Sequence, residues 1–591
     1  MNRFSFMSLG VLVFFLLACS QQKEEGLHAQ FDRELSELIA LNDQFLQTIR
    51  DESSLERYHN DFLQLRLSYK KVEAFAAYFT PTTVRLVNGA PLDEIEDSEN
   101  AVFEPGGLQV IETYIYTDQP LEKKELIREV RKLQVHLKRI KALWKDTSIT
   151  DTQVLDALRL SLFRLITLGI SGFDTPASGN AIRESEVVLA SFQSYLTAYS
   201  SVLPDVDGIK VLTDRALGYL KGQHDFNAFD RATFIVDYIN PISKALHENQ
   251  RQAQIPFMMT GSLLRGDAAT LFEKGAFDPE NLVLNDALKA TPDRVLLGQT
   301  LFFDTRLSGN GQTSCGTCHR PDLAFTDRLK TSRGIDQLFI QRNAPTLLYA
   351  SYQQALFYDL RSPSLEDQAS DVIHNKKEMH GVMDHIVSLV KADPAYQKLY
   401  TKAYPEAKAV SDIHIKNALS TFVRSLGGFN SPFDAFMRGD KKALTDDQRA
   451  GFNLFMGKAQ CGTCHFIPLF NGTVPPDYQN TESEVLGVTV DADWQHPRLD
   501  ADRGRGAYND FPQWQYAFKT PTIRNIDATG PYMHNGSYNS LQQVLEFYNQ
   551  GGGAGLGLSV PNQTLSADQL DLTQDEMERV ILFMEALSDV N

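Results

Sequence analysis

Two identical five-residue motifs carry the most specific chemistry in this sequence. They are Cys315-Gly-Thr-Cys318-His319 and Cys461-Gly-Thr-Cys464-His465. In a CxxCH motif the two thiols add to the vinyl groups of a haem, and the adjacent histidine becomes the proximal iron ligand. A zinc knuckle and a thioredoxin-like dithiol are the alternatives, but the duplication and the histidine after each pair favour haem. We therefore expect two covalently bound c-type haems.

The remaining cysteine indicates the cellular compartment. Of the five cysteines, only Cys19 lies outside a CxxCH motif. It follows an apolar run, residues 4–18, that suits a signal peptide and is too short to span a bilayer comfortably. The run ends in Leu16-Leu17-Ala18-Cys19, which resembles a bacterial lipobox, whose cysteine is acylated. We expect residues 1–19 to be a lipoprotein signal peptide and Cys19 to tether a periplasmic or surface lipoprotein of the bacterial cell envelope. A plain signal peptide and a simple membrane anchor are the alternatives.

Length and charge limit the remaining possibilities. The chain has 591 residues, which is too long for one hydrophobic core. Its formal net charge of −18 argues against nucleic acid or an anionic membrane surface as a partner, and favours a basic donor protein. Hydrophobic residues at 42% and charged residues at 22% are ordinary for a globular protein.

The elements that would position the motifs are mainly helical. Between about residues 26 and 260, apolar side chains recur at spacings of three and four, which is typical of amphipathic helices. Two such sets are Phe62, Leu65, Tyr69, Val72 and Phe75, and Leu126, Val130, Leu133, Leu137, Ile140 and Trp144. Beyond residue 270, Gly, Pro and Asn separate shorter helical signals, and capping boxes begin at Thr445 and Thr573. The predicted fold class is mainly α: an N-terminal helical bundle followed by two cytochrome-c-like haem domains.

Two segments of the N-terminal half resemble the imelysin-like helical domains of bacterial envelope proteins. They are Arg66-Leu-Ser-Tyr-Lys-Lys-Val-Glu73 and Gly107-Leu-Gln109-Val-Ile-Glu112. In that family the second segment usually reads GxHxxE, and its histidine and glutamate are suspected metal ligands. Here Gln109 replaces the histidine, and an amide is a poor transition-metal ligand beside imidazole. We expect residues 20–265 to form a structural or docking bundle rather than a metal site at Glu73 and Glu112.

Around the CxxCH motifs, about residues 285–590 resemble the bacterial di-haem cytochrome c peroxidase family, including its branch of methylamine-utilisation maturation enzymes. The matching segments are Leu297-Gly-Gln-Thr-Leu-Phe-Phe-Asp-Thr-Arg-Leu-Ser-Gly-Asn310, Arg342-Asn-Ala-Pro-Thr-Leu347, Phe357-Tyr-Asp-Leu-Arg361, Ser364-Leu-Glu-Asp-Gln368, Lys519-Thr-Pro-Thr-Ile-Arg-Asn525 and Gly530-Pro-Tyr-Met-His-Asn-Gly536. The resemblance implies a first cytochrome c domain with the peroxidatic haem at 266–440 and a second with the electron-transfer haem at 441–591.

The resemblance also implies catalytic residues. A peroxidase needs an accessible iron, an acid/base group and a reserve of electrons. Counted from the first haem cysteine, Gln368 and Glu378 occupy the family's glutamine and glutamate positions. Glu378 would be the general acid/base and Gln368 would position the oxidant; the alternative is that both are solvated surface side chains. Tyr358 stands where relatives carry a tryptophan between the haems, and core packing is its alternative role.

The sequence identifies the proximal histidine of each iron, but it offers several candidates for the ligand on the opposite side. Many family members cap the first iron with a second histidine, but this chain has neither histidine nor methionine between His319 and His374. We expect an open first iron, with His374, Met379 or His380 as alternative caps. For the second iron, the family position falls on Tyr548, with Met533 as the rival ligand.

The same resemblance implies a calcium ion between the haem domains, bound by the Asn343 side chain and by the Thr529 and Pro531 carbonyls, oxygen ligands that suit this ion.

These residues together predict an enzyme. It would reduce hydrogen peroxide at the first haem with electrons passed through the second haem from a small donor, such as a cytochrome c or a cupredoxin. The alternatives are peroxide-dependent oxidation of a protein or organic substrate, and a non-enzymatic electron-transfer or iron-acquisition lipoprotein. For the oligomeric state, the expectations include a homodimer.

Overall fold

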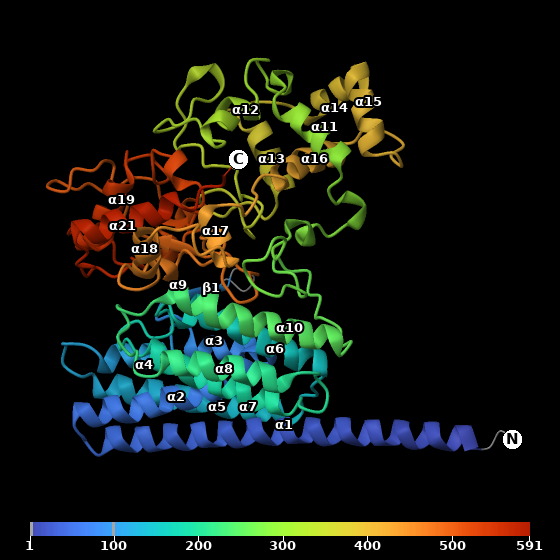
Figure 1. The fold of residues 1–591 in the computed structure, drawn as a ribbon. Coiled ribbons are helices and arrows are strands. Elements are labelled where there is room, and N and C mark those ends of the chain that lie inside the picture. Colours follow the sequence, from blue (N-terminus) through green and yellow to red (C-terminus); the bar gives the residue numbers. More distant parts are fainter. Residues whose placement is uncertain (1–3, 97–100, 591) are drawn as a thin grey trace. The chain divides into compact units, whose positions relative to one another are not determined.

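The computed structural model describes residues 4–96 and 101–590, and the chain divides into two compact units (Figure 1). The first unit is Met1–Thr260 with Gly266–Thr270, and the second is Gly261–Arg265 with Leu271–Asn591. Both are mainly helical, which confirms the predicted fold class. Within the described residues, no helix has both the length and the apolar character needed to cross a membrane.

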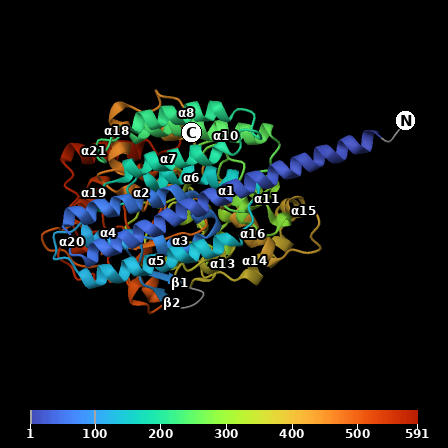
Figure 2. The same ribbon diagram turned by 90° about the horizontal axis from the view of Figure 1, so that it is seen from below.

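The first unit is a bundle of helices with one small hairpin. Its α-helices are α1 (Phe4–Arg50), α2 (Leu55–Phe79), α3 (Pro81–Asn88), α4 (Leu108–Ile115), α5 (Lys123–Lys145), α6 (Asp151–Arg164), α7 (Ala181–Thr197), α8 (Val206–Leu220), α9 (Arg231–Thr233) and α10 (Asn240–Gln252), with π-helical turns at Leu165–Gly169 and Phe234–Ile239. Strands β1 (Glu94–Glu96) and β2 (Ala101–Phe103) pair antiparallel. Helix α1 packs along α2 and α5, and α2 also packs on α7 (Figures 1 and 2). The backbone of Cys19 lies in α1, and its side chain lies outside the described part.

The two apolar stripes predicted from the sequence are the buried faces of α2 and α5. At the end of α5, the Trp144 ring packs against Phe31 and Phe75, and its Nε1 donates a hydrogen bond to the His28 carbonyl at 3.2 Å. These contacts attach α5 to α1 and α2. The periodic positions therefore form the core of the bundle, because they share one side of each helix.

A cluster of buried charged side chains lies inside this bundle. Arg66 makes a bidentate ion pair with Glu184 at 2.7 Å, and Lys70 contacts Glu73 at 2.7 Å and Asp174 at 2.6 Å. Burial alone would raise the pKa of Asp174, but Arg164 and Lys70 hold it below its usual range. Buried charges are tolerated when they are paired in this way.

Side chains of the two imelysin-like segments make hydrogen bonds and ion pairs inside the bundle, and of the candidate metal ligands there only Glu112 Oε2 is buried without a hydrogen-bond partner in the described residues. Gln109 Nε2 donates to the Asn88 carbonyl at 3.1 Å, and Glu112 Oε1 accepts from the Ser178 amide at 2.6 Å. Glu73 lies 3.3 Å from Arg164 as well as beside Lys70. In the described residues there is no cluster of His, Cys, Asp and Glu side chains suited to a metal ion. These contacts fit a structural bundle.

The second unit carries both CxxCH motifs. Its α-helices are α11 (Pro292–Phe302), α12 (Cys315–Cys318), α13 (Leu365–His374), α14 (Met383–Ala392), α15 (Pro394–Ala403), α16 (Asp412–Arg424), α17 (Pro432–Met437), α18 (Asp446–Met456), α19 (Leu541–Asn549), α20 (Gly552–Gly555) and α21 (Gln574–Glu585). Short 3₁₀ turns lie at Pro279–Leu282, Asp286–Leu288, Thr305–Leu307, Pro321–Leu323, Ile335–Gln337, Cys461–Thr463, Arg505–Ala507, Pro512–Trp514 and Ile526–Ala528. Strands β3 (Ser483–Val485) and β4 (Ala517–Lys519) pair antiparallel.

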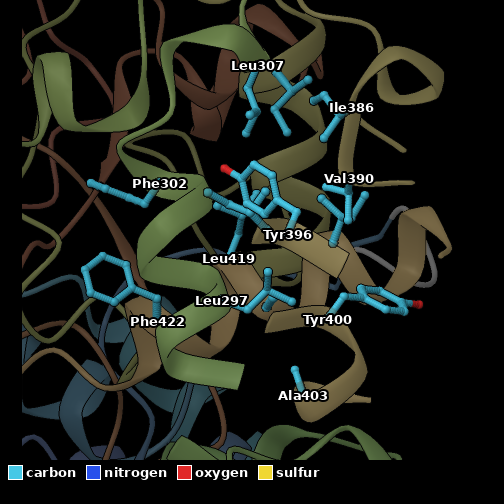
Figure 3. Close-up of a cluster of buried hydrophobic side chains, with 14 of the residues drawn as sticks. Leu297, Phe302, Leu307, Ile386, Val390, Tyr396, Tyr400, Ala403, Leu419 and Phe422 are labelled. Atoms are coloured by element: carbon cyan, nitrogen blue, oxygen red, sulfur yellow. The ribbon is translucent and has the colours of Figure 1, made fainter. Parts of the chain in front are cut away.

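Two helix groups support the two motifs. Around the first, α11 and α13 pack on α16 and α15 packs on α11, and Leu297, Tyr396 and Leu419 lie in the resulting apolar cluster (Figure 3). Around the second, α18 packs on α21, and the predicted capping boxes at Thr445 and Thr573 begin these two helices. The helix starts were predictable because a capping box is a local sequence signal.

A buried ion pair supports the second motif. Arg524 is fully buried and donates to Asp434 through Nη1 at 2.9 Å and Nη2 at 2.8 Å, while its Nε donates to the Pro468 carbonyl at 2.8 Å. The rings of Tyr349 and Phe429 lie around the guanidinium group. Arg524 therefore connects α17 to the loop that directly follows the second CxxCH motif.

Candidate haem sites

The first CxxCH motif forms the short helix α12. The Ser314 amide donates to Thr317 Oγ1 at 3.0 Å at its start, and the ring of Phe303 lies over Gly316, where an added Cβ would be 2.3 Å from the ring. His319 Nδ1 lies 3.0 Å from the Phe325 carbonyl. Because a carbonyl oxygen can only accept, Nδ1 carries the proton and Nε2 keeps the lone pair that could bind iron.

The second CxxCH motif repeats this arrangement of the histidine with different neighbours. His465 Nδ1 lies 3.2 Å from the Phe470 carbonyl, and burial lowers the pKa of His465 to about 4, so the imidazole is neutral. Thr463 Oγ1 donates to the Gln460 carbonyl at 2.6 Å. A Cβ at Gly462 would lie 2.5 Å from the sulfur of the buried Met456.

The residues at both motifs fit a haem. All four thiols are free, so none is committed to a disulfide, and burial raises the pKa of Cys315 and Cys461 to about 12. Each histidine is held by a backbone carbonyl in the tautomer that leaves Nε2 for iron. Two free thiols beside such a histidine are the donor set that c-type haem requires.

A large cavity surrounds the first motif and brings several predicted residues together. It contains about 1310 Å³ of space that protein atoms do not fill, part of it open to solvent. Its walls include Cys315, Cys318, His319, Asn343, Tyr358, Gln368, Glu378 and Met379. The walls are mainly apolar, with Phe302, Leu419 and Val423 among them. A large flat cofactor with apolar faces suits such a cavity.

Glu378 lies where this cavity meets a second, more open hollow of about 620 Å³. Glu378 Oε1 accepts a hydrogen bond from Asn375 Nδ2 at 2.7 Å. Burial raises the pKa of this carboxyl, while Arg361 opposes the shift and Asp371 adds to it. A carboxyl with a raised pKa, facing both a cavity and a path to solvent, is suited to proton transfer.

The candidates for capping the first iron lie in different places. Met379 is buried and contributes to the cavity wall, whereas His374 is exposed and lines the outer hollow, with its Nδ1 2.8 Å from the Ser370 carbonyl. His380 is exposed and is absent from the described walls of both spaces.

Tyr358 and the predicted calcium ligands lie together at the edge of the first cavity. The Tyr358 hydroxyl donates to Asn343 Oδ1 at 2.5 Å, and Asn343 Nδ2 donates to the Pro531 carbonyl at 3.0 Å. The Asn343 amide also donates to the His534 carbonyl at 3.1 Å. Thr529 lies two residues before Pro531, and its hydroxyl donates to the Ile526 carbonyl.

Tyr548 lies on α19 close to the second motif. Burial raises its pKa above the usual range, and the neighbouring Cys464, Cys461 and Glu484 act in the same direction. Ser540 caps the start of α19, the helix that carries Tyr548. Met533 lies in the loop before α19 with a left-handed backbone (φ 70°), and its carbonyl accepts from the Gly536 amide.

Some residues near the sites were not singled out from the sequence. Arg361 lies at the end of a quoted motif, and its guanidinium is 3.5 Å from the centre of the Phe357 ring in the outer hollow. The only sequence signal for Asn375 is its position three residues before Glu378, a spacing at which the two side chains can form a hydrogen bond. Glu484 is half-buried near Cys464 and Tyr548, and no local pattern indicates it.

Comparison with known proteins bears on the second unit. A family model for di-haem cytochrome c peroxidase matches residues 292–442. The methylamine utilization protein MauG of Methylorubrum extorquens is 34% identical over 309 residues, which cover 52% of this chain and 82% of MauG. The cytochrome c551 peroxidase of Nitrosomonas europaea is 31% identical over 338 residues, covering 56% of this chain and 91% of that protein. A crystal structure of a MauG-like protein associated with microbial copper homeostasis is 28% identical with a TM-score of 0.45, covering 52% of this chain and 92% of that one.

Two thiol-histidine sites on a helical scaffold, one of them opening into a large cavity, define an oxidoreductase that holds c-type haem. The relatives and the family model agree with this class, and the chain belongs to the di-haem cytochrome c peroxidase family. It is an enzyme of peroxidase function with two c-type haems, and peroxide is the substrate that its relatives imply. The predicted family, fold class and function are thereby confirmed, whereas the roles of individual residues stay predictions.

Proposed function

We propose that peroxide reacts at the first site, with Glu378 as general acid/base and Gln368 positioning the oxidant. The observation that carries this proposal is that both side chains line the same cavity as Cys315, Cys318 and His319. A haem bound there would supply an iron with an open coordination position and the electrons for reduction of the peroxide.

Glu378 would move the proton between the two peroxide oxygens. Asn375 holds one carboxyl oxygen at 2.7 Å, so the other is free to turn toward the cavity. The outer hollow, lined by Arg361, Asp371 and His374, would connect the carboxyl with solvent protons. Leaving the first iron open fits this arrangement, because His374 lies in the outer hollow and His380 is absent from the described walls of both spaces.

The second site would store and deliver electrons. His465 would be the proximal ligand and Tyr548 the second ligand, in preference to Met533, because Tyr548 lies beside Cys461 and Cys464. A tyrosine ligand stabilises oxidised iron, whereas methionine raises the reduction potential. Tyr358, at the edge of the first cavity, would be the aromatic group between the two haems.

The test of this proposal is the Glu378→Gln variant of the holoprotein. We expect its reaction with hydrogen peroxide to slow by about 10²- to 10⁴-fold, the usual contribution of a general acid/base group. The haem content and the absorption spectrum before mixing should stay unchanged. Glu406→Gln is the control, because Glu406 is an exposed glutamate in the loop between α15 and α16. If Glu378→Gln reacts as fast as the control, Glu378 is not the acid/base group.

A second candidate activity is peroxide-dependent oxidation of a protein or organic substrate. It is favoured by Tyr548 and by the absence of histidine and methionine between His319 and His374. EPR and optical spectra after peroxide addition distinguish the two activities. A stable high-valent state without donor supports substrate oxidation, and rapid return to the ferric state only with a reduced donor supports peroxide reduction. Two low-spin haems inert to peroxide would leave an electron-transfer or iron-acquisition lipoprotein.

The remaining features are part of the same proposal. The electron donor would be a small redox protein such as a cytochrome c or a cupredoxin. Cys19 would be acylated and hold the enzyme at the membrane as a periplasmic or surface lipoprotein. Mass spectrometry of the purified chain tests the lipid, and elemental analysis tests for calcium at Asn343, Thr529 and Pro531. Sedimentation tests for a homodimer.

A further inference from the structure

One face of helix α5 in the first unit is basic along its whole length. Every residue of this face is exposed, and none is acidic. It consists of Lys124, Arg128, Arg131, Val135, Lys138, Ala142 and Lys145. We call these seven residues the basic face.

Helix geometry explains why these residues share a face. They follow one another at spacings of four and three, so they form a straight row opposite the buried residues of α5. The row runs from Lys124 to Lys145 and is about 32 Å long at 1.5 Å per residue. The two glutamates of the helix lie off the row: Glu125 contacts Arg128, and the buried Glu129 contacts Lys132.

Most of the charge on this face is available to a partner. Lys124, Arg131, Lys138 and Lys145 form no ion pair with any acidic residue in the described part of the chain. Helix α5 has nine Lys or Arg and two Glu, a net of +7, in a chain whose total is −18. The negative net charge of the chain does not cancel the positive charge of α5, because salt screens the interaction between exposed charges beyond about 10 Å.

The C-terminal end of α5, which carries one end of the basic face, lies close to helix α1. At the end of α5, Trp144 donates to the His28 carbonyl of α1 at 3.2 Å, and Lys141 donates to Ser36 Oγ at 2.6 Å. Cys19 precedes His28 by nine residues on the same helix, a distance of about 14 Å along the axis. A lipid on Cys19 would therefore hold this end of α5 near the bilayer.

We propose that the basic face binds the anionic phospholipid surface of the membrane and holds the first unit flat against it. The proposal rests on the proposed acylation of Cys19, because one lipid chain with a polybasic patch is a stable combination for anchoring. Two exposed apolar side chains, Val135 (64% exposed) on the face and Leu143 (46% exposed) beside it, could enter the headgroup region. A long straight row of cations fits a flat anionic surface better than a compact acidic protein.

The test measures vesicle binding without the lipid anchor. The holoprotein beginning at Ser20 keeps the whole of α5 and lacks both the leader and the acyl group, so its binding reports the basic face alone. We expect flotation with vesicles that contain phosphatidylglycerol, little with pure phosphatidylcholine, and release at high salt. The test variant changes four residues of the face: Lys124→Gln, Arg131→Gln, Lys138→Gln and Lys145→Gln. It should reduce the partition coefficient by about tenfold or more.

A matched variant controls for the change in total charge. It removes the same number of positive charges from four exposed lysines elsewhere: Lys221→Gln, Lys244→Gln, Lys274→Gln and Lys398→Gln. Binding that the control keeps and the test variant loses supports the proposal. Equal binding by the two variants, or no binding of the wild type to anionic vesicles at low salt, overturns it; in the second case an acidic protein is the better occupant. Acylation of Cys19 is measured separately by mass spectrometry, so the two proposals fail independently.

Discussion

The buried pair of Arg524 and Asp434 gives the sharpest prediction about stability. The change Arg524→Met keeps the length of the side chain but removes the charge. It leaves the buried Asp434 carboxylate without its bidentate partner and the Pro468 carbonyl without its donor. Removing one partner of a buried pair costs about 3–5 kcal/mol, because the remaining charge is desolvated and unpaired. We expect the free energy of unfolding of the second unit to fall by that amount.

Urea unfolding followed by the haem absorption band measures this loss. Both haem motifs lie in the second unit, so this signal reports that unit and not the helical bundle. Arg524→Lys is a useful comparison, because lysine keeps the charge but cannot make the bidentate contact with Asp434. It should lower the free energy of unfolding by less than Arg524→Met does. Replacing both partners, Arg524→Met with Asp434→Leu, should recover part of the loss because no charge is then left buried.

The same pair predicts a dependence on pH. Burial would raise the pKa of Asp434, but Arg524 holds it below its ordinary value of 3.8. A carboxyl with a lowered folded-state pKa stabilises the fold above its unfolded pKa, and this stabilisation is lost as pH falls through the folded value. The stability advantage of the wild type over Asp434→Asn should therefore be constant above about pH 4 and shrink in more acidic solution. A loss below about 1 kcal/mol for Arg524→Met, or no recovery in the double variant, would refute this reasoning.

Three further predictions concern the two sites and the bundle. The rate of reaction with peroxide should fall as pH drops through a value above 4.5, since burial raises the pKa of Glu378, and a stopped-flow pH profile of Glu378→Gln should lack that step. Tyr548→Met should raise the reduction potential of the second haem and add a methionine-to-iron charge-transfer band, seen by spectroelectrochemistry; an unchanged spectrum would exclude Tyr548 as a ligand. Glu184→Gln should weaken the buried pair with Arg66 and lower the free energy of unfolding of the bundle by about 3 kcal/mol. Urea unfolding followed by far-UV circular dichroism measures this loss, and the haem bands should stay unchanged at low urea. An unchanged free energy of unfolding would mean that the pair adds nothing to stability.

Local sequence signals predicted much of the fold. The buried faces of α2 and α5 follow from spacings of three and four, and the starts of α18 and α21 follow from their capping boxes. The haem attachment residues are contiguous, so two short motifs were sufficient to identify them. The resemblance to a family supplied Glu378 and Gln368, whose shared cavity depends on α13 folding back over the first motif.

Contacts between distant segments were not predictable in the same way. Arg524 and Asp434 are 90 positions apart, and nothing in either local sequence indicates the other. Asn343 was expected to face a calcium ion, but its side-chain oxygen also accepts from Tyr358, a contact that depends on how two loops meet. The net charge of −18 gave no indication of the basic face of α5, because a net charge sums over surfaces that a partner contacts separately.

The two Cys-Gly-Thr-Cys-His motifs show how identical letters can be under different constraints. Gly316 faces the ring of Phe303, which is 40% exposed and has room to turn aside, whereas Gly462 faces the sulfur of the fully buried Met456. The threonines differ as well, since Thr317 accepts from a backbone amide and Thr463 donates to a carbonyl. Substitutions of the two residues between the cysteines should therefore be tolerated better in the first motif than in the second. The same pair of residues, Gly and Thr, thus meets two different packing requirements.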